Sequence, residues 1–533
     1  MTLLKNRFTI RNVTGIRSKS QCFPPGEQMK EDNERLAGIL MHITSLPSPG
    51  GIGDMGPEAL SFIDFLASSH ASLWQILPLG PTGYGDSPYA PRSSFAGNEL
   101  LISLQRLHEY GLVTSDELAA IPRTSDSKTE YGKMISYRIP LLLCAASRFI
   151  EKFSDNPSYL AFKAANASWL EDYCTFMVIS RTYNDQRWNS IWPEELGRRD
   201  QRALAAYKAQ HCFEIEQWAA LQYLFDCQWK AIKSYANSRG ISIIGDIPIF
   251  VAPDSADAWS QTYLFKTDPC GQFSAFSGVP PDLFSKAGQF WGNPVYDWER
   301  SRETDYRWWK QRIARQLELC DILRIDHFRG FESYWEIPAG RTDAVVGSWI
   351  PGPGAAFFKD LQAAFPSMKI VAEDLGFTTP EVIRMLKQTG FPGMKIALDG
   401  FSLDSSGKLD LTNPSLPCNY PYNSICYPGT HDNDTIAGWY GTLPPDLKSA
   451  ISSYYGLDSK HVSINEALIS DILESRSHYA VIPMQDLLGL GSEARMNTPA
   501  TCSDRNWSWR MLPGSCTEAL ESRIAAAVKA SSR

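Results

Sequence analysis

Residues 321–330 read Asp-Ile-Leu-Arg-Ile-Asp-His-Phe-Arg-Gly, and this stretch decides the fold. The apolar run from Ile322 to Ile325 predicts a short buried strand, interrupted by Arg324 and closed by Asp326. Burying a charged group without a partner is costly, so these two side chains need either each other or a site. On a strand they point to the same side, and the guanidinium can keep the carboxylate ionised. Taken alone, the pair fits an ion pair that caps a strand or a carboxylate nucleophile.

Apolar runs of similar length recur along the chain, with helical patterns or insertions between them. Helical spacing of apolar residues marks segments 57–69 and 380–386. We predict strands within residues 38–46, 73–79, 241–250, 321–330, 368–376, 393–398, 424–435 and 480–487. Strands that alternate with helices form a parallel sheet, and eight of them predict an α/β fold, the (β/α)8 TIM barrel, with large and mostly helical insertions.

The longer gaps between the predicted strands are expected to be insertions. Apolar residues at helical spacing make residues 105–238 a mostly helical insertion. A second insertion, 251–320, contains the stretch 278–294, rich in Gly, Pro and aromatic residues without a steady period. That composition fits a flap over an active site or a well-packed ordered loop. We expect a flexible N-terminal extension, a catalytic barrel and a C-terminal tail packed on the barrel, at residues 1–37, 38–500 and 501–533.

Composition excludes several classes of protein. The net charge of −8 gives no basic surface for nucleic acid or anionic lipid. The sequence contains no apolar run of the roughly 18 residues that a membrane span requires. The 11 cysteines are scattered and form no Cys-x-x-Cys pair, so we expect reduced thiols rather than a zinc ribbon or a redox motif. The 63 aromatic residues (Trp 16, Tyr 22, Phe 25) fill a core or form a stacking surface for a ligand.

The N-terminal segment is basic. Residues 1–26 contain no acidic residue and carry Lys5, Arg7, Arg11, Arg17 and Lys19. Such a segment resembles a weak plastid transit peptide, or it is a basic tail on a cytoplasmic protein. The segment is short and shows no amphipathic period, so we favour the cytoplasmic interpretation and keep the plastid as the alternative.

Acidic residues follow several of the predicted strands. They stand at or just past the ends of strands three, four, five and seven, as Asp246, Asp326, Glu373 and Asp432. In a parallel barrel these ends share one face, so the carboxylates are expected to converge there as a metal cage or as general acid and base. The neighbouring Arg324, His327 and His431 disfavour a Mg²⁺ or Ca²⁺ cage, and we expect no metal. Paired carboxylates, flanking aromatic residues and the lack of a phosphate loop indicate a glycosidic bond as the target.

From about Gly38 to Asn497 the chain resembles the amylomaltases, also called 4-α-glucanotransferases or disproportionating enzymes, which are relatives of the α-amylases. The motifs that carry the resemblance lie at residues 80–89, 244–250, 278–294, 324–330, 372–376, 429–435 and 489–497.

The resemblance implies a mechanism and its residues. Asp326 would be the nucleophile that forms a covalent glucosyl-enzyme, and Glu373 the acid and then the base. Retention of configuration requires these two carboxyl groups roughly 5–5.5 Å apart. Asp432 would hold the hydroxyls of the distorted sugar beside the cleaved bond. No cofactor is implied.

The resemblance also implies a set of substrate-binding residues. They are Tyr84, Ser87, Tyr89, Asp246, Phe284, Gln289, Trp291, Arg324, His327, His431 and Asn497. The aromatic members would stack on glucose rings of malto-oligosaccharides or of glucans derived from starch or glycogen. We expect a monomer or a weak homo-oligomer that binds neither nucleic acid nor membrane.

Three alternatives to glucan transfer stay open from the residues alone. The same three carboxylates serve an α-amylase-like hydrolase, in which water replaces the acceptor sugar. A glucan-binding protein without catalysis is a second alternative, although intact acids at all three positions argue against it. A lyase or isomerase acting on phosphate sugars would require a lysine at a strand end, and no predicted strand end offers a clear one.

Overall fold

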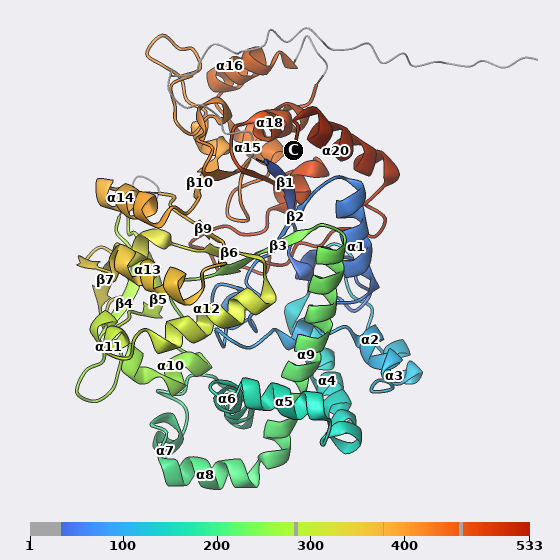
Figure 1. Cartoon of the computed structure of the whole chain (residues 1–533), viewed down its shortest axis with the longest axis vertical. Coiled ribbons are helices and arrows are strands. Elements are labelled where there is room, and N and C mark those ends of the chain that lie inside the picture. The colour runs from blue at the N-terminus through green and yellow to red at the C-terminus, as the bar shows by residue number, and fades with distance from the viewer. Residues whose placement is uncertain (1–33, 282–285, 377, 458–461) are drawn as a thin grey trace, which may run out of the picture. The chain divides into compact units, whose positions relative to one another are not determined.

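The computed structural model describes residues 34–281, 286–376, 378–457 and 462–533 (Figure 1). Residues Arg35–Arg533 form one compact unit, and the elements given below belong to it. The predicted N-terminal extension falls outside the described residues up to position 33.

Eight parallel strands close into a barrel in the described part of the chain, which confirms the predicted fold. Their order around the barrel is β1-β12-β11-β10-β9-β6-β3-β2. β1 closes the ring on β12 through five paired residues, from Leu36 with Tyr479 to Leu40 with Pro483. The strands are β1 Leu36–Leu40, β2 Leu73–Gln75, β3 Ser242–Ile247, β6 Ile322–Ile325, β9 Ile370–Ala372, β10 Gly393–Ile396, β11 Ser424–Tyr427 and β12 Tyr479–Pro483.

Most of these strands are shorter than the apolar runs that predicted them. β2 ends at Gln75, although Ile76 and Leu77 continue the apolar run and are buried. After β1 the chain turns into the short 3-10 helix η1, Ile43–Ser45. An apolar run indicates that its residues are buried, and it does not show that they pair with a neighbouring strand. Here the apolar runs continue past the last hydrogen bond of the sheet into buried loops.

The helices of the barrel begin and end at recognisable capping residues. α14 begins where the Thr379 side chain accepts the Val382 N–H, and it ends at Gly390, whose φ of +73° favours glycine. α1 has Pro57 in its first turn, where a missing N–H costs nothing. These and the other helices outside the first insertion are α1 Pro57–Ser68, α10 Ala256–Ser260, α11 Trp298–Glu303, α12 Arg307–Leu319, α13 Gly354–Ala364, α14 Pro380–Thr389, α15 Ile436–Thr442, α16 Pro445–Tyr455, α18 Ile464–Glu474, α19 Met484–Leu487 and α20 Glu518–Ala530.

A group of helices lies between β2 and β3. Its longest member, α9, runs towards β3, and Figure 1 shows α5 to α8 around the far end of that helix. The buried Arg138 of α4 donates to Asp54 at 3.0 Å, which fixes the group to a loop of the barrel. These helices are α2 Leu104–Glu109, α3 Ser115–Ala119, α4 Tyr131–Phe153, α5 Pro157–Ala165, α6 Leu170–Thr182, α7 Glu194–Gly197, α8 Gln201–Gln210 and α9 Cys212–Ser238.

A second, antiparallel sheet has the strand order β5-β4-β7-β8. Its strands are β4 Ala275–Val279, β5 Gln289–Pro294, β7 Ser333–Pro338 and β8 Ser348–Pro351. Two of these strands, β4 and β5, occupy much of the described part of 278–294, where the sequence showed no steady period and no strand was predicted. The glycines and a register shift between Phe276 and Gly278 hide the alternation that marks a strand. No strand was predicted at β7 or β8.

Two general properties follow from the described residues. No helix there combines the length and apolar character that crossing a membrane demands. Every cysteine in the same residues has a free thiol, as predicted.

Candidate active site

The carboxyl ends of neighbouring barrel strands bring four of the predicted residues side by side. Asp246 on β3 pairs in register with Arg324 on β6. Ile325 on β6 pairs with Ala372 on β9, so the residues that follow these two strands, Asp326 and Glu373, emerge at the same edge. Strand order, rather than sequence distance, therefore places these side chains together.

Arg324 holds two carboxylates at once. Its Nη1 donates to both oxygens of Asp246 at 2.8 and 2.7 Å, and its Nη2 donates to Oδ1 of Asp326 at 2.9 Å. The third donor, Nε, lies 3.3 Å from Sδ of Met394 on β10. Arg324 and Asp246 are buried, whereas the Asp326 side chain is 29% exposed. The clamp therefore presents Asp326 at the surface of the site as an oriented carboxylate.

Glu373 has a different environment. Its Oε2 accepts the backbone N–H of His327 at 2.7 Å, and its Oε1 accepts the N–H of Leu375 at 2.8 Å. Burial and the nearby charge of Asp326 raise the Glu373 pKa to about 7, with Arg324 and the two amides opposing. His327 has a left-handed backbone with φ of +50°, which is uncommon outside glycine and occurs here where its amide meets Glu373.

Asp432 lies in the loop that follows β11. Its Oδ2 is 3.3 Å from Nε2 of His431, and its Oδ1 accepts from Nδ2 of Asn497 at 2.6 Å. Arg495 donates to the backbone oxygen of Asp432 at 2.6 Å. Burial raises the Asp432 pKa, but His431, Asn497 and Arg324 outweigh it and lower the pKa to about 2. The side chain is 44% exposed, so it is an anion that faces solvent.

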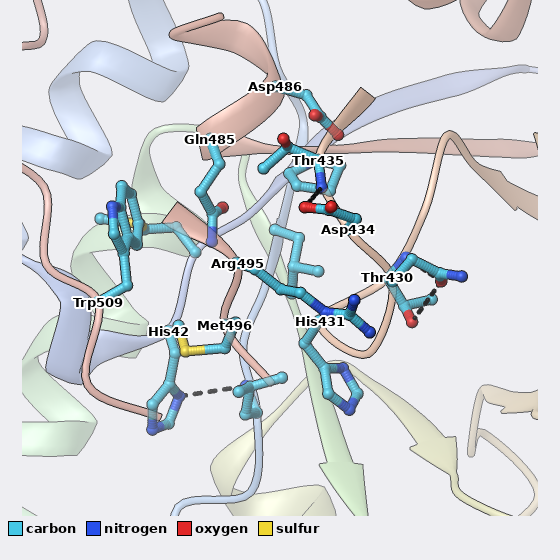
Figure 2. A pocket seen from close by; sticks show the side chains of 15 residues that line it. His42, Thr430, His431, Asp434, Thr435, Gln485, Asp486, Arg495, Met496 and Trp509 are labelled. Atoms are coloured by element: carbon cyan, nitrogen blue, oxygen red, sulfur yellow. Dashed lines mark hydrogen bonds between the residues drawn. The ribbon is translucent and has the colours of Figure 1, made fainter. Parts of the chain in front are cut away.

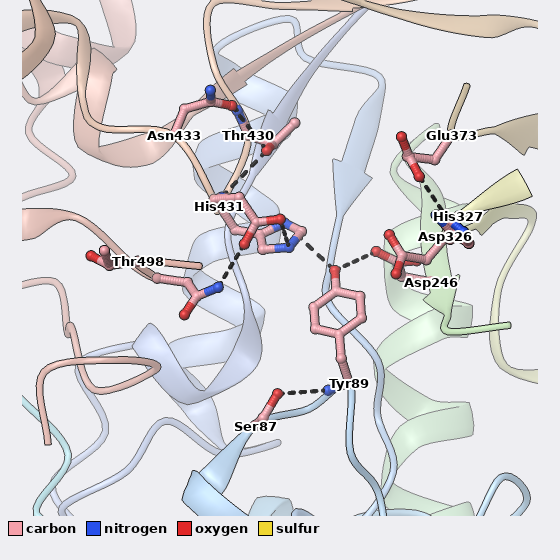
Figure 3. Close-up of polar contacts among 12 residues, drawn as sticks. Ser87, Tyr89, Asp246, Asp326, His327, Glu373, Thr430, His431, Asn433 and Thr498 are labelled. Carbon is pink, nitrogen blue, oxygen red and sulfur yellow. Dashed lines mark hydrogen bonds and ion pairs between the residues drawn. The ribbon is translucent and has the colours of Figure 1, made fainter. Parts of the chain in front are cut away.

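Tyr89 contacts both Asp246, which binds Arg324, and His431, which contacts Asp432. Its hydroxyl donates to Oδ2 of Asp246 at 2.7 Å and lies 3.5 Å from Nδ1 of His431. Its ring stacks on the His431 ring at 4.9 Å. Ser87 accepts the Tyr89 N–H at 3.2 Å, which fixes the loop. Figure 3 shows Tyr89 between His431 on one side and Asp246 and Asp326 on the other.

Trp291 and Gln289 of β5 reach the site through His327. The Trp291 ring lies 4.8 Å from the His327 ring at 88°, and its Nε1 donates to Gln289 at 3.3 Å. Burial lowers the His327 pKa to about 4, so the imidazole is neutral at pH 7. Among the described residues its buried Nε2 has no hydrogen-bond partner. An unpaired ring nitrogen beside an aromatic face suits a sugar hydroxyl.

The structure does not join two predicted residues to this network. Tyr84 lies on the short helix η2, Tyr84–Asp86, is 76% exposed and lines a different cavity of about 730 Å³. That cavity is also lined by Arg92 and Glu99, and by none of the three predicted catalytic carboxylates. Phe284 lies outside the described residues. The binding roles of both stay predictions.

A small cavity of about 20 Å³ lies next to His431 (Figure 2). Its lining includes His42, whose Nδ1 accepts the Leu77 N–H at 3.2 Å, together with Asp486 and Arg495. A cavity of this volume with polar walls accommodates one water molecule. His42, Arg495 and Met394 were not predicted. Arg495 alone had a signal, because it lies within the stretch 489–497 that carried the family resemblance.

The arrangement favours acid–base and nucleophilic chemistry over metal chemistry. In the described residues, no group of His, Cys, Asp and Glu side chains is placed to hold a metal ion. The carboxylates instead contact Arg324, His431, Asn497 and backbone amides. One exposed carboxylate paired with a cation and one carboxyl with a raised pKa are the two groups that a retaining glycosidase mechanism requires.

Comparisons with known proteins place the chain in a family. A family model described as 4-alpha-glucanotransferase matches residues 41–515. The chain is 43% identical to the 4-alpha-glucanotransferase of Streptococcus pneumoniae serotype 4, over 92% of this chain and 95% of that protein. It is 42% identical to the enzymes of that name from Thermus thermophilus, over 94% and 99%, and from chloroplasts and amyloplasts of Arabidopsis thaliana, over 92% and 84%. The amylomaltase from Streptococcus agalactiae in complex with acarbose superposes with a TM-score of 0.89 at 37% identity, covering 94% of this chain and 100% of that one.

Proposed function

The chain belongs to the 4-alpha-glucanotransferase family, and from this membership we propose that it transfers α-1,4-glucan segments from a donor glucan to the hydroxyl of an acceptor sugar. The observation that supports this most is the contrast between two neighbouring carboxyl groups. Asp326 is clamped by Arg324, while the Glu373 pKa is raised to about 7. A nucleophile must be charged and an acid must hold its proton, so such a contrast assigns the two roles.

The first half of the reaction breaks the glycosidic bond. An oxygen of Asp326 attacks the anomeric carbon, and the bond to the leaving oxygen breaks as Glu373 gives that oxygen its proton. The product is a covalent glucosyl ester of Asp326 and a shortened glucan. The proton can sit on a Glu373 lone pair that the two backbone amides leave free. General acid catalysis of this kind contributes roughly 10²–10⁴-fold.

The second half forms the new bond. An acceptor hydroxyl loses its proton to Glu373 as it attacks the anomeric carbon, and the Asp326 carboxylate leaves. Esterification removes the negative charge of Asp326, which is one of the causes that raise the Glu373 pKa. The pKa therefore falls in the intermediate, and Glu373 is then ready to act as base. Two displacements on opposite faces retain the configuration.

Asp432 and His431 fit the hydroxyls of the sugar that reacts. Asp432 is anionic and 44% exposed, and His431 contacts it at 3.3 Å. Hydrogen bonds to a charged acceptor are stronger than those between neutral groups, and they strengthen as the sugar ring gains positive charge. Tyr89 links these two residues to Arg324, because its hydroxyl donates to Asp246, which Arg324 also binds.

Transfer requires that sugar outcompete water. Water is about 55 M and an acceptor sugar about 10 mM, so the preference for the sugar must exceed ~5 kcal/mol at about 1.4 kcal/mol per tenfold. In the hairpin of β4 and β5, the Trp291 ring packs against the His327 ring. This hairpin is the segment best placed to exclude water from the part of the site around Glu373, the proposed acid.

Incubation of pure protein with maltotriose tests the function. We expect a ladder of longer glucans with little net gain of reducing ends. Glucose and maltose without any longer product would instead identify an α-amylase-like hydrolase.

The nucleophile has its own test. Asp326→Asn should lower turnover by more than a thousandfold, because a neutral amide cannot form the ester, while affinity for maltoheptaose changes little. Asp374→Asn is the matched control, since Asp374 accepts the backbone N–H of Met394 at 2.7 Å and an amide oxygen can also accept it. Unimpaired turnover in Asp326→Asn contradicts the assignment.

A further inference from the structure

The β7–β8 hairpin exposes a group of apolar side chains. Trp349 is 38% exposed, and Val345 and Val346 are each 51% exposed. Trp335 lies beside them, and we call these four residues the hairpin patch. We propose that the hairpin patch binds a segment of a long α-glucan remote from the reacting bond, on the side where the leaving group departs and the acceptor enters. This inference rests on the proposed function.

The indole of Trp349 is held in place before any ligand arrives. The Arg329 guanidinium carbon lies 3.8 Å from its ring centroid, and the Trp335 ring lies 5.4 Å away at 64°. Trp335 is itself fixed, because its Nε1 donates to the Ala344 oxygen at 3.0 Å. A ring that is already ordered loses little entropy on binding, which favours affinity.

The four side chains form one surface. Trp335 and Trp349 are direct partners on β7 and β8, so their rings project from the same face of the sheet. The loop between the strands passes over Trp335, since a Cβ on Gly347 would meet its ring at 2.6 Å. Val345 and Val346 stand between Ala344 and Gly347 in that loop. The patch therefore continues from the ring pair to the tip of the hairpin.

The antiparallel sheet extends from the hairpin patch to the part of the site around Glu373. At one edge, Trp291 of β5 contacts His327, whose amide binds Glu373. At the other edge, Trp349 of β8 covers Arg329, two residues after His327. Both edges thus touch the segment that follows the nucleophile. Glu373 protonates the leaving oxygen, so a glucan reaching the sheet is on its leaving-group or acceptor side.

The dimensions suit an oligosaccharide. Four strands at about 4.8 Å spacing separate the two edges by about 14 Å, a distance that a chain of several glucose units spans and a short sugar does not. Exposed indole faces stack on the C–H faces of sugars, and the exposed Ser348 and Arg341 and the half-buried Asp343 beside the patch can bind hydroxyls. A stable protein interface takes about 20–30 residues a side, far more than this patch provides.

The test compares a long substrate with a short one. For Trp349→Ala, we expect the ratio of kcat/KM on maltoheptaose to kcat/KM on maltotriose to fall at least fivefold. If the ratio stays at the wild-type value, the proposal is overturned, even if both kcat/KM values fall. Such a result means that Trp349 affects the active site through Arg329 and does not bind glucan. Tyr110→Ala removes another exposed aromatic ring, 51% exposed and outside the hairpin patch, and should leave the ratio unchanged.

A second variant covers the case in which Trp349→Ala does not fold. Val345→Ser with Val346→Ser alters the exposed tip without touching Arg329, and it should lower the ratio at least twofold. Affinity electrophoresis through amylose, in the Asp326→Asn background, reads binding without turnover and should show weaker retardation for both patch variants. Unchanged retardation contradicts the patch, even if maltotriose gives no ladder and the transferase proposal itself fails. A patch variant that instead dissociates a dimer assigns the surface to a second copy of the chain and likewise overturns the proposal.

Discussion

In the proposed reaction, Glu373 is protonated in the first step and ionised in the second. Burial and the charge of Asp326 raise its pKa to about 7, so the protonated form predominates below pH 7 and is lost as the pH rises. We predict that kcat/KM on maltotriose falls above pH 7 along a limb with one proton, because the free enzyme then lacks its acid.

Glu373→Gln tests whether this limb belongs to Glu373. The variant should lose roughly 10²–10⁴-fold in kcat/KM and should also lose the limb near pH 7. A pH–rate profile measured on both proteins provides the comparison. If kcat/KM of Glu373→Gln still falls above pH 7, another titrating group causes the decrease.

We expect Met394 to position Arg324, a role that its side-chain type does not suggest. Its sulfur is the partner of the Arg324 Nε in a buried clamp, at 3.3 Å. Met394→Leu leaves that donor without an acceptor, and an unsatisfied buried donor costs about 1–3 kcal/mol. We predict a lower urea midpoint and a lower kcat, because the guanidinium can tilt away from Asp326.

Met385→Leu is the matched control for Met394→Leu. Met385 is buried in α14 outside the clamp, and volume-conserving apolar exchanges usually cost less than about 1.5 kcal/mol. If both variants have the same kcat, the thioether has no positioning role.

The sequence predicted single residues unevenly. Arg324 and Asp326 could be paired from their spacing, because residues two apart on a strand share a side. The contact between Tyr89 and Asp246 could not, since it joins a loop and a strand 157 residues apart. Met394 carried no signal at all, because a methionine in an apolar strand is indistinguishable from an ordinary core residue.

At the scale of elements, the β4–β5 hairpin depends on one glycine. A Cβ on Gly278 would lie 2.3 Å from the Gln289 oxygen and 2.7 Å from Cδ1 of Ile337. Gly278→Ala must therefore push β5 away from β4 and shift Trp291 with it. We predict that the fraction of turnovers ending in hydrolysis rises severalfold, measured as net reducing ends formed per glucan transferred.

Gly441→Ala serves as the control for Gly278→Ala, since a Cβ there meets nothing within 4 Å. It should leave the hydrolysed fraction at the wild-type value. An unchanged fraction in Gly278→Ala would show that the hairpin does not exclude water.

The sequence pattern predicted the barrel strands but missed the strands of the second sheet. The barrel strands are buried on both faces, so their apolar runs were conspicuous, as at residues 322–325. β7 and β8 are short, partly exposed strands in which polar and aromatic residues mix, and nothing in residues 333–351 marks them. β4 and β5 were hidden by glycine and by their bulge.

At the scale of the whole molecule, Arg533 ties the two ends of the barrel sequence together. Its side chain donates to the oxygens of Leu473 at 2.6 Å, Leu36 at 3.2 Å, His478 at 3.3 Å and Ser475 at 2.9 Å. These acceptors flank β1 and β12, where the barrel closes.

We predict that Arg533→Ala lowers the free energy of unfolding by about 1.5–3 kcal/mol, since hydrogen bonds from a charged donor are lost. Urea unfolding followed by tryptophan fluorescence measures this, and the exposed Arg505→Ala is the control. Equal midpoints for the two variants would show that Arg533 contributes nothing to closure. The activity of folded Arg533→Ala should match the wild type, because none of these contacts reaches the site.

The pairing of β1 with β12 has a consequence during synthesis on the ribosome. β1 is finished at residue 40 and its partner at residue 483, so at 5–20 residues per second the first strand waits about 20–90 s for its neighbour. The groups that we propose to bind the sugar come from Tyr89 at one extreme and Asn497 at the other. A nascent fragment that ends before Asn497 therefore lacks part of the proposed site, and we expect a newly made chain to act on glucan only after residue 497 has been translated.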